Sequence, residues 1–175
     1  MSDDTKAVGA ITNAIIEALL NRDAVLADFP RRTELQDLED DVFYSLSIYL
    51  ELCDYLEERL GRYAFLRIGR RMALAVMDST FPPSLQTVEE AVAQINAAHE
   101  MVCKPALGGF DIIDANAAGL SVHYTAPYNC TLQEGAFYEL ALRYGASNAT
   151  VTHAKCRRKG RDACQFDIQY ATNNH

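Results

Sequence analysis

The chain lacks long apolar runs and carries few cations for its length. No apolar stretch approaches the roughly 20 residues that a transmembrane helix needs, and residues 1–4 show neither the basic nor the apolar region of a signal peptide. We therefore expect a cytoplasmic protein that does not associate with membranes. The 16 lysines and arginines are outnumbered by 24 aspartates and glutamates, which gives a formal net charge of −8. This charge argues against a nucleic-acid binder, because such a protein needs a cationic face.

The motifs of the common enzyme classes are also missing. The sequence contains no Gly-x-Ser-x-Gly nucleophile motif, no phosphate-binding loop and no dinucleotide-binding fingerprint. No combination of nucleophile, base and orienting group stands out in the remaining residues. We predict that the protein is not an enzyme.

Hydrophobic periodicity predicts a helical first half. Apolar residues recur every three or four positions in the segments 7–20, 42–59, 63–77 and about 87–103. Thr87 with Glu90 three residues later forms the sequence of a capping box, which marks the start of the last of these helices. The polar segment 27–41 contains Pro30 and is predicted to be a connector with one or two helical turns.

The period changes to two after Pro105, which indicates strands. Two alternating segments flank a turn at 116–119, a helix is predicted at 132–144, and strands at 149–155 and 164–170 follow. This order predicts an α+β fold in which a helical N-terminal half packs on an antiparallel sheet of about four strands. We expect one domain over residues 1–175, made of an N-terminal helix with its connector (1–41), a helical layer (42–104), and the sheet with one helix (105–175).

Three of the five cysteines stand near the C-terminus together with a histidine. Cys156 and Cys164 flank a turn at 159–162, so that a hairpin would bring them together, and Cys130 and His153 complete a set of ligands that zinc accepts. Four protein ligands leave no position for water, so such a zinc ion would be structural. The alternative is that these are ordinary half-buried thiols, because His153 and Cys156 would face opposite sides of a regular strand unless a bulge intervenes.

The C-terminal half resembles the 4-vinyl-reductase domain family. The resemblance lies in the segment Gly119-Leu-Ser-Val-His-Tyr124, the helix bearing Gly135 and Glu139, and the clasp Cys156-x7-Cys164-Gln-Phe-Asp-Ile168. The helical half is compatible with bacterial members at Tyr44-Ser-Leu-Ser-Ile-Tyr-Leu50, Ile68-Gly-Arg70 and Phe81-Pro-Pro-Ser-Leu85. The resemblance implies a fold related to H-NOX haem proteins and to subunits of the TRAPP trafficking complex.

Within that family the clasp is most similar to the sensor domains of NtrC-type activators that bind aromatic effectors. Those domains hold a structural zinc ion with a cysteine before a helix, a glutamate on a later strand and two clasp cysteines. The corresponding residues here are Cys130, His153 in place of the glutamate, Cys156 and Cys164. The resemblance implies a sensor that acts through a partner signalling protein and forms a homodimer through its helical face.

The resemblance also implies a pocket between the helical layer and the sheet for a small apolar or aromatic ligand. The candidate lining residues are aromatic residues and methionines, namely Phe43, Tyr44, Tyr49, Phe65, Met72, Met77, Phe81, Phe137 and Tyr138. Two alternatives remain open for these residues and for the protein. The side chains are core residues in an interaction or assembly scaffold that binds no ligand, or the protein is a haem-based gas sensor.

The haem alternative rests on His99. The resemblance places His99 on the helix where an H-NOX protein carries its haem ligand. H-NOX proteins hold the haem propionates with a Tyr-x-Ser-x-Arg motif, whereas the comparable stretch here is Tyr124-Thr-Ala-Pro-Tyr128, with tyrosine in place of arginine. Because the propionates lose their bidentate guanidinium partner, the sequence argues against haem and favours zinc as the cofactor.

Overall fold

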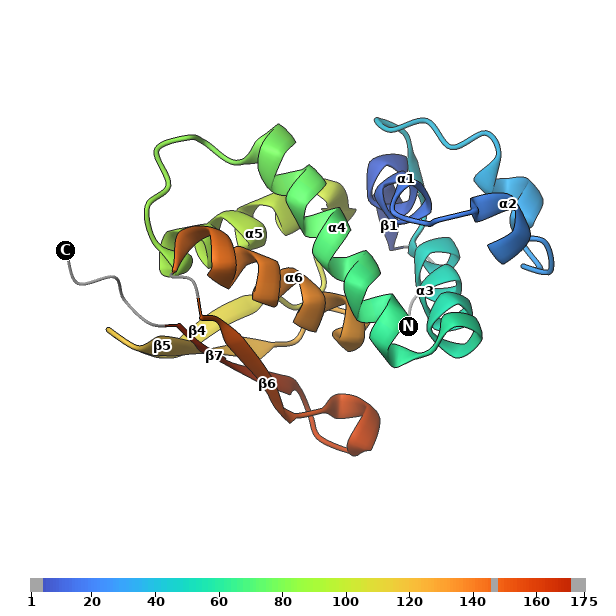
Figure 1. Cartoon of the computed structure of the whole chain (residues 1–175). Helices are drawn as coiled ribbons and strands as arrows, with labels where there is room; N and C mark the ends of the chain where they lie inside the picture. The colour runs from blue at the N-terminus through green and yellow to red at the C-terminus, as the bar shows by residue number, and fades with distance from the viewer. Residues whose placement is uncertain (1–4, 146–147, 171–175) are drawn as a thin grey trace.

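The structure is a computed structural model that describes residues 5–145 and 148–170. Its helices are α1 (Gly9–Glu17), α2 (Arg22–Val25), α3 (Leu46–Leu60), α4 (Arg62–Thr80), α5 (Val88–Val102) and α6 (Cys130–Tyr144), with 3-10 turns η1 (Arg32–Leu35) and η2 (Arg157–Lys159). Its strands are β1 (Lys6–Val8), β2 (Phe43–Ser45), β3 (Cys103–Lys104), β4 (Phe110–Asn116), β5 (Gly119–Tyr124), β6 (Thr150–Lys155) and β7 (Cys164–Gln169). The predicted α+β fold is confirmed (Figure 1). The N-terminal residues 1–4, considered for a signal peptide, lie outside the described ranges.

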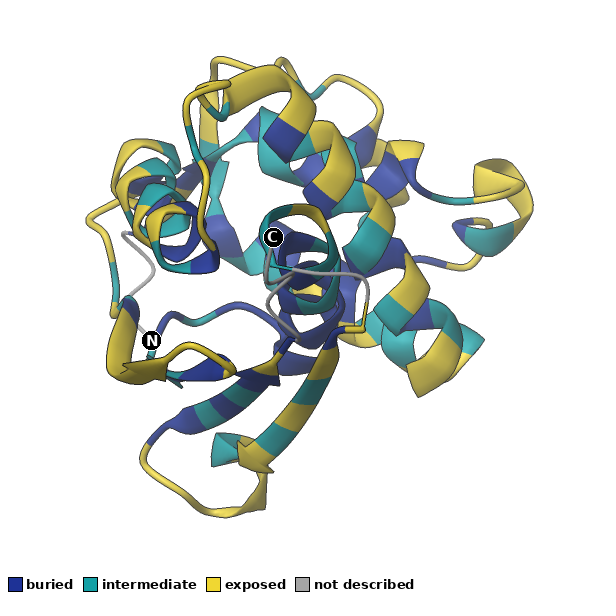
Figure 2. Ribbon diagram, turned by 60° about the vertical axis from the view of Figure 1, so that its left-hand side comes forward, coloured by how far each residue is buried: buried dark blue, intermediate teal, exposed yellow. Residues whose placement is uncertain are grey.

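The four C-terminal strands form an antiparallel sheet in the order β4-β5-β7-β6. Buried and more exposed residues alternate along β5 and β7, as Figure 2 shows, because one face of the sheet is covered by α6. Val122, Phe166 and Ile168 on this face form the core together with Phe137 and Leu140 of α6. The predicted hairpin turn between residues 116 and 119 joins β4 to β5.

Helix α6 is enclosed between the sheet and α4 (Figure 1). Two glycines allow the backbones of α4 and α6 to touch. A Cβ atom on Gly69 would lie 2.1 Å from the carbonyl oxygen of Leu132, and one on Gly135 would lie 2.2 Å from that of Leu66. Because no side chain separates the two helices at this point, the N-terminal end of α6, which begins at Cys130, is held close to α4.

The strand β4 lies at one edge of the sheet and extends beyond the core. Its register with β5 shifts between Ile112 and Asp114, and the intervening Ile113 is 55% exposed. The opposite edge strand, β6, shifts its register against β7 between His153 and Lys155. Both irregularities are bulges, which change the direction in which the following side chains point.

A second, small sheet was not predicted from the sequence. It has the order β2-β1-β3, so that the segments around residues 7, 44 and 103 lie side by side. The helix predicted from residue 42 consequently begins at Leu46, where Ser45 accepts a hydrogen bond from the backbone N–H of Ser47. The capping box at Thr87 and Glu90 is present as predicted. None of the helices in the described ranges has the length and apolar character needed to cross a bilayer.

Candidate metal centre and ligand pocket

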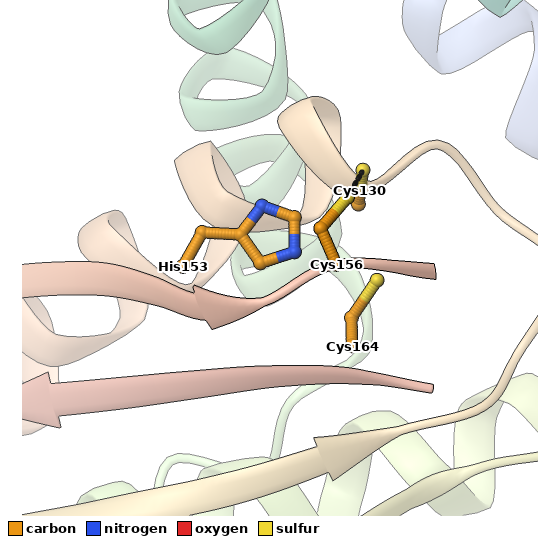
Figure 3. Close-up of side chains that lie close together, drawn as sticks. All are labelled: Cys130, His153, Cys156 and Cys164. Atoms are coloured by element: carbon orange, nitrogen blue, oxygen red, sulfur yellow. Dashed lines mark hydrogen bonds between the residues drawn. The ribbon is translucent and has the colours of Figure 1, made fainter. Parts of the chain in front are cut away.

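The structure brings Cys130, His153, Cys156 and Cys164 together at the N-terminal end of α6 (Figure 3). The four potential ligand atoms all lie within 4.8 Å of one another, and the Sγ atoms of Cys130 and Cys156 are 3.9 Å apart. Tetrahedral zinc with Zn–S bonds of about 2.3 Å separates its sulfur ligands by about 3.8 Å. The cluster therefore has the dimensions of a zinc site.

The bulge in β6 explains how His153 and Cys156 reach the same cluster. On a regular strand, residues three apart face opposite sides of the sheet. Here His153 is paired with Phe166 and Lys155 with Gln165, so Ala154 is an additional residue that restores the two side chains to one side. The sequence indicated that a bulge was required at this point, and the structure contains it.

The environment of His153 leaves one ring nitrogen available. Its ring stacks on Phe166 with the ring centres 4.4 Å apart, and its Nδ1 lies 3.8 Å from a carboxylate oxygen of Glu134. Its Nε2 is buried and has no hydrogen-bond partner among the described residues. Figure 3 shows the edge of the imidazole turned toward the sulfur atoms. A metal ion in the cluster would satisfy Nε2.

Hydrogen bonding within the cluster separates the acidities of two of its thiols. The contact between Cys130 and Cys164 raises the pKa of Cys130 and lowers the pKa of Cys164 to about 7. The backbone N–H of Arg157 lies 3.5 Å from the Sγ atom of Cys164 and donates to it. The cluster thus contains a thiol that ionises near neutral pH, and the thiolate is the form that binds metals.

A carboxylate on α3 connects this cluster to the N-terminal helices. Glu57 accepts hydrogen bonds from Thr131 Oγ1 at 2.5 Å, Asn129 Nδ2 at 2.9 Å and Arg158 Nη1 at 2.5 Å. Burial opposes the ionisation of Glu57, but these three hydrogen bonds outweigh burial and lower its pKa. Asn129 caps the N-terminus of α6, and Arg158 follows the cluster cysteine Cys156 by two residues. Glu57 therefore contacts the neighbours of two of the cysteines.

A separate pocket of about 430 Å³ lies between α1, α4 and α5. His99 on α5 is 3% exposed and lines this pocket. Its Nδ1 lies 2.7 Å from the hydroxyl of Tyr128, and its buried Nε2 has no hydrogen-bond partner in the described part of the chain. Burial lowers the pKa of His99, which favours the neutral imidazole. His99 is thus a neutral histidine on the wall of the pocket, and its ring also lies close to the backbone of Leu107 and Gly108.

The walls of this pocket are mainly apolar. The larger apolar lining residues are Ile11, Tyr49, Met72, Val76, Ile95, Val102, Phe110 and Tyr128. No lysine or arginine is among the described residues that line it, whereas Glu17 and Asp40 are. An apolar ligand without negative charge suits such a lining best.

The aromatic residues and methionines that were predicted to line one pocket lie in several different places in the structure. Tyr49 and Met72 line the pocket of about 430 Å³, and Met77 and Phe81 line an adjoining one of about 90 Å³ together with Met72. The others lie elsewhere: Phe65 and Phe137 are fully buried core residues, Phe43 is exposed on β2, Tyr44 donates to the carbonyl of Asp37, and Tyr138 stacks under Arg70.

Sequence reasoning did not identify several residues around His99. Ile95 and Val102 fall in the helix predicted at about 87–103, and Phe110 in the alternating segment after Pro105, but none of them was assigned a role in a pocket. Tyr128 was noted only as the residue in place of an arginine. The spacing of Ile95, His99 and Val102 indicates that they share one helix face, but it does not distinguish a packed face from one that borders a pocket.

The sequence matches no protein-family model and no curated protein. Its fold matches solved structures of H-NOX proteins. An H-NOX protein from S. oneidensis in the Fe(II)NO ligation state is 14% identical with a TM-score of 0.74, over 94% of this chain and 99% of that one. An Fe(II) unliganded H-NOX protein from K. algicida is 16% identical with a TM-score of 0.72, over 96% and 98% of the two chains.

An oxygen-binding H-NOX domain related to soluble guanylate cyclases is 11% identical with a TM-score of 0.66, and the match covers 95% of each chain. At these identities the similarity concerns the fold. The relationship in fold to H-NOX proteins that the sequence implied is confirmed. The likeness to the 4-vinyl-reductase family and to NtrC-type sensor domains is supported by none of these comparisons and stays a prediction. The chain has an H-NOX-like fold.

Proposed function

We propose that this chain is a sensor domain that binds a small, largely apolar ligand beside His99 and contains a structural zinc ion at the N-terminal end of α6. The observation that carries the ligand site is a buried histidine with an unpartnered Nε2 on the wall of a pocket of about 430 Å³. This volume lies within the roughly 300–1,000 Å³ of small-molecule sites. The residue that sequence analysis named only for an alternative thus becomes the centre of the proposal.

Haem is the first candidate ligand, because the matching structures are H-NOX proteins in Fe(II) states. His99 would hold the iron through its unpartnered nitrogen, and Met72, Val76 and Ile95 would contact the ring. A bound haem would supply an iron atom that takes up a diatomic gas. This inference reverses the argument against haem drawn from the sequence.

The residues fit the iron and the ring better than the propionates. The pocket has no cationic side chain in the described ranges, and the hydroxyl of Tyr128 is already bonded to His99. Two carboxylates, Glu17 and Asp40, also line the pocket and would repel propionates. We therefore expect haem to dissociate readily. A neutral apolar or aromatic molecule is the second candidate, favoured by the same absence of cations.

Absorption spectroscopy separates the two candidates. The protein is produced with excess haem, and the Soret band is recorded before and after addition of NO. The proposal for haem predicts a Soret band that shifts with NO and disappears in His99→Ala, but not in the control His123→Ala on the sheet. Absence of the band in the wild-type protein refutes the haem proposal. Native mass spectrometry of the same sample then shows whether another molecule occupies the pocket, or none, as the scaffold alternative requires.

The zinc proposal has its own support and its own test. A ring nitrogen of His153 and three cysteine sulfurs lie within 4.8 Å of one another, and Nε2 of His153 is buried without a hydrogen-bond partner among the described residues. Metal analysis of protein purified without chelator should find one zinc ion per chain. Cys156→Ser should lose the zinc, and Cys103→Ser, which changes a buried cysteine outside the cluster, should retain it. Equal zinc content in both variants contradicts the assignment.

We propose that the sensor acts through a partner protein and is not an enzyme; this part of the proposal follows from the sensor role and from the lining of the pocket, in which no nucleophile with an adjacent base stands out among the described residues. A homodimer formed through the helical layer remains part of the proposal. Native mass spectrometry gives the oligomeric state with and without ligand, and a monomer at all concentrations would remove the homodimer from it.

A further inference from the structure

The four arginines of α4 fall into two groups. Arg62 and Arg70 form ion pairs with glutamates of α6 at 2.5 and 2.7 Å. Arg67 and Arg71 form no ion pair with any residue in the ranges 5–145 and 148–170, although the chain has 24 acidic and 16 basic residues. An acidic protein that leaves two neighbouring arginines unpaired has positive charge available for another molecule.

Arg67 and Arg71 line a pocket of about 190 Å³ between α4 and the ends of α1, α2 and α3. We call this site the basic groove. Its other lining residues are all apolar, namely Ala18, Leu19, Leu20, Val25, Leu60, Ala64 and Ile68. Arg71 Nη1 donates to the carbonyl oxygen of Ala18 at 3.2 Å, which holds its guanidinium beside the pocket. No carboxylate is among the described lining residues.

Two large exposed side chains lie in or next to the basic groove. The lining residue Leu20 is 72% exposed, and Tyr63, which lies one helical turn before Arg67 but does not line the groove, is 76% exposed. Tyrosine and arginine are enriched in protein interfaces, where a central pocket receives an apolar side chain of the partner. The volume of about 190 Å³ is below the range of small-molecule sites, roughly 300–1,000 Å³. The groove is therefore sized for a side chain of a protein partner.

We infer that the basic groove docks a segment of a partner protein in which an apolar side chain is flanked by aspartates or glutamates. The apolar side chain would enter the pocket, and the carboxylates would pair with Arg67 and Arg71. Charge complementarity of this kind speeds association and weakens with salt. This docking does not depend on what occupies the pocket at His99.

The helices of the groove also border the pocket at His99. The pocket at His99 is lined by Ile11, Ala14 and Glu17 of α1 and by Met72 and Val76 of α4. The groove is lined by the residues that follow α1 and by the earlier turns of α4. Figure 1 shows α1 and α3 on one side of α4 and α6 on the other. If the ligand shifts α1 against α4, the shape of the groove changes. This coupling, unlike the docking itself, rests on the proposed sensor function.

The test uses the full chain and a fluorescent synthetic helical peptide with leucines on one face and glutamates elsewhere. A matched peptide carries lysine in place of glutamate. The acidic peptide should bind, the lysine peptide should not, and salt should weaken binding. Arg67→Glu/Arg71→Glu should weaken binding at least tenfold. Leu20→Ser, at an exposed position that cannot affect folding much, should weaken it several-fold.

The control is Lys159→Glu/Arg161→Glu, which makes the same change of charge at exposed residues outside the groove. It should bind the acidic peptide nearly as well as the wild-type protein. Equal loss in both double variants, equal binding of both peptides, or no binding by the wild-type protein would overturn the inference. If the acidic peptide binds equally well with and without added haem, the docking is supported and the coupling is refuted.

Discussion

Replacing Glu57 with glutamine tests whether its contacts hold the cluster against α3. The carboxylate accepts three hydrogen bonds, from Thr131, Asn129 and Arg158. Asn129 and Arg158 both donate to Oε2 of Glu57, so a glutamine with its amide oxygen at that position keeps both contacts, and the hydroxyl of Thr131 can accept from the amide N–H₂ group. We therefore expect Glu57→Gln to keep the arrangement of the contacts but to remove the negative charge that strengthens them.

The magnitude follows from the burial of each contact. A hydrogen bond to a charged group contributes about 1.5–3 kcal/mol and a neutral one about 0.5–1.5 kcal/mol, so the bonds made by Asn129 and Thr131 should each weaken by about 1 kcal/mol. The side chain of Arg158 is 43% exposed, so its ion pair contributes only about 0–1 kcal/mol. The expected loss in the free energy of unfolding is about 2–3 kcal/mol. For a domain of this size the melting temperature falls by roughly 4–12 °C.

Urea unfolding followed by circular dichroism measures this loss. Glu51→Gln is the matched control, since Glu51 on the same helix is 53% exposed and pairs only with Arg31 among the described residues. The control should lose less than about 0.5 kcal/mol. A loss for Glu57→Gln that is no larger than the control would refute the reasoning.

The pH dependence gives a second check on the same variant. The pKa of Glu57 is lowered from 4.5 in the folded protein, so its contribution to stability is complete above pH 4.5 and is lost as the pH falls through the folded value. The difference between wild type and Glu57→Gln should therefore be constant at neutral pH and should shrink below pH 4.5. A difference that grows on acidification contradicts the assignment of Glu57 as an ionised acceptor.

Three further predictions concern packing and metal. Gly135→Ala places a Cβ atom 2.2 Å from the carbonyl oxygen of Leu66, and because that contact is with backbone it should lower the free energy of unfolding by about 1–3 kcal/mol or more; unchanged urea unfolding would contradict the close approach of α4 and α6. His153→Ala should weaken zinc binding by at least about tenfold, because it removes one of the four proposed ligands, and competition with a chromophoric chelator measures this affinity. Removal of zinc by a chelator should increase hydrogen exchange in β6 and β7 more than in α4, and equal exchange in both would argue against a structural ion.

Local patterns in the sequence predicted those parts of the fold that local contacts decide. The capping box of α5 depends on residues three apart, and the turn between β4 and β5 depends on a few consecutive residues. The small sheet was missed because Lys6 pairs with Ser45 and with Lys104, far away in the sequence. Its strands have only two or three residues, too few to show a period.

The two sites differ in how far the sequence could define them. Cysteine and histidine ligands are recognisable by residue type, so the four members of the cluster could be identified from the sequence. Apolar residues look alike in a sequence whether they fill a core, as Phe65 does, or border a pocket, as Met72 does. The sequence named His99 only for the haem alternative, and the role proposed for it draws its support from its burial, its unpartnered nitrogen and the H-NOX-like fold.

The edge strand β4 bears on whether molecules of this protein pair through their sheets at high concentration. An edge strand presents unpaired backbone groups that can recruit a strand of a second molecule. The bulge at Ile113 interrupts this row, and Asp111 and Asp114 place negative charge next to it. A second copy approaching there would meet misaligned donors and like charges. The protein can thus expose an isoleucine on an open strand without forming continuous intermolecular sheets.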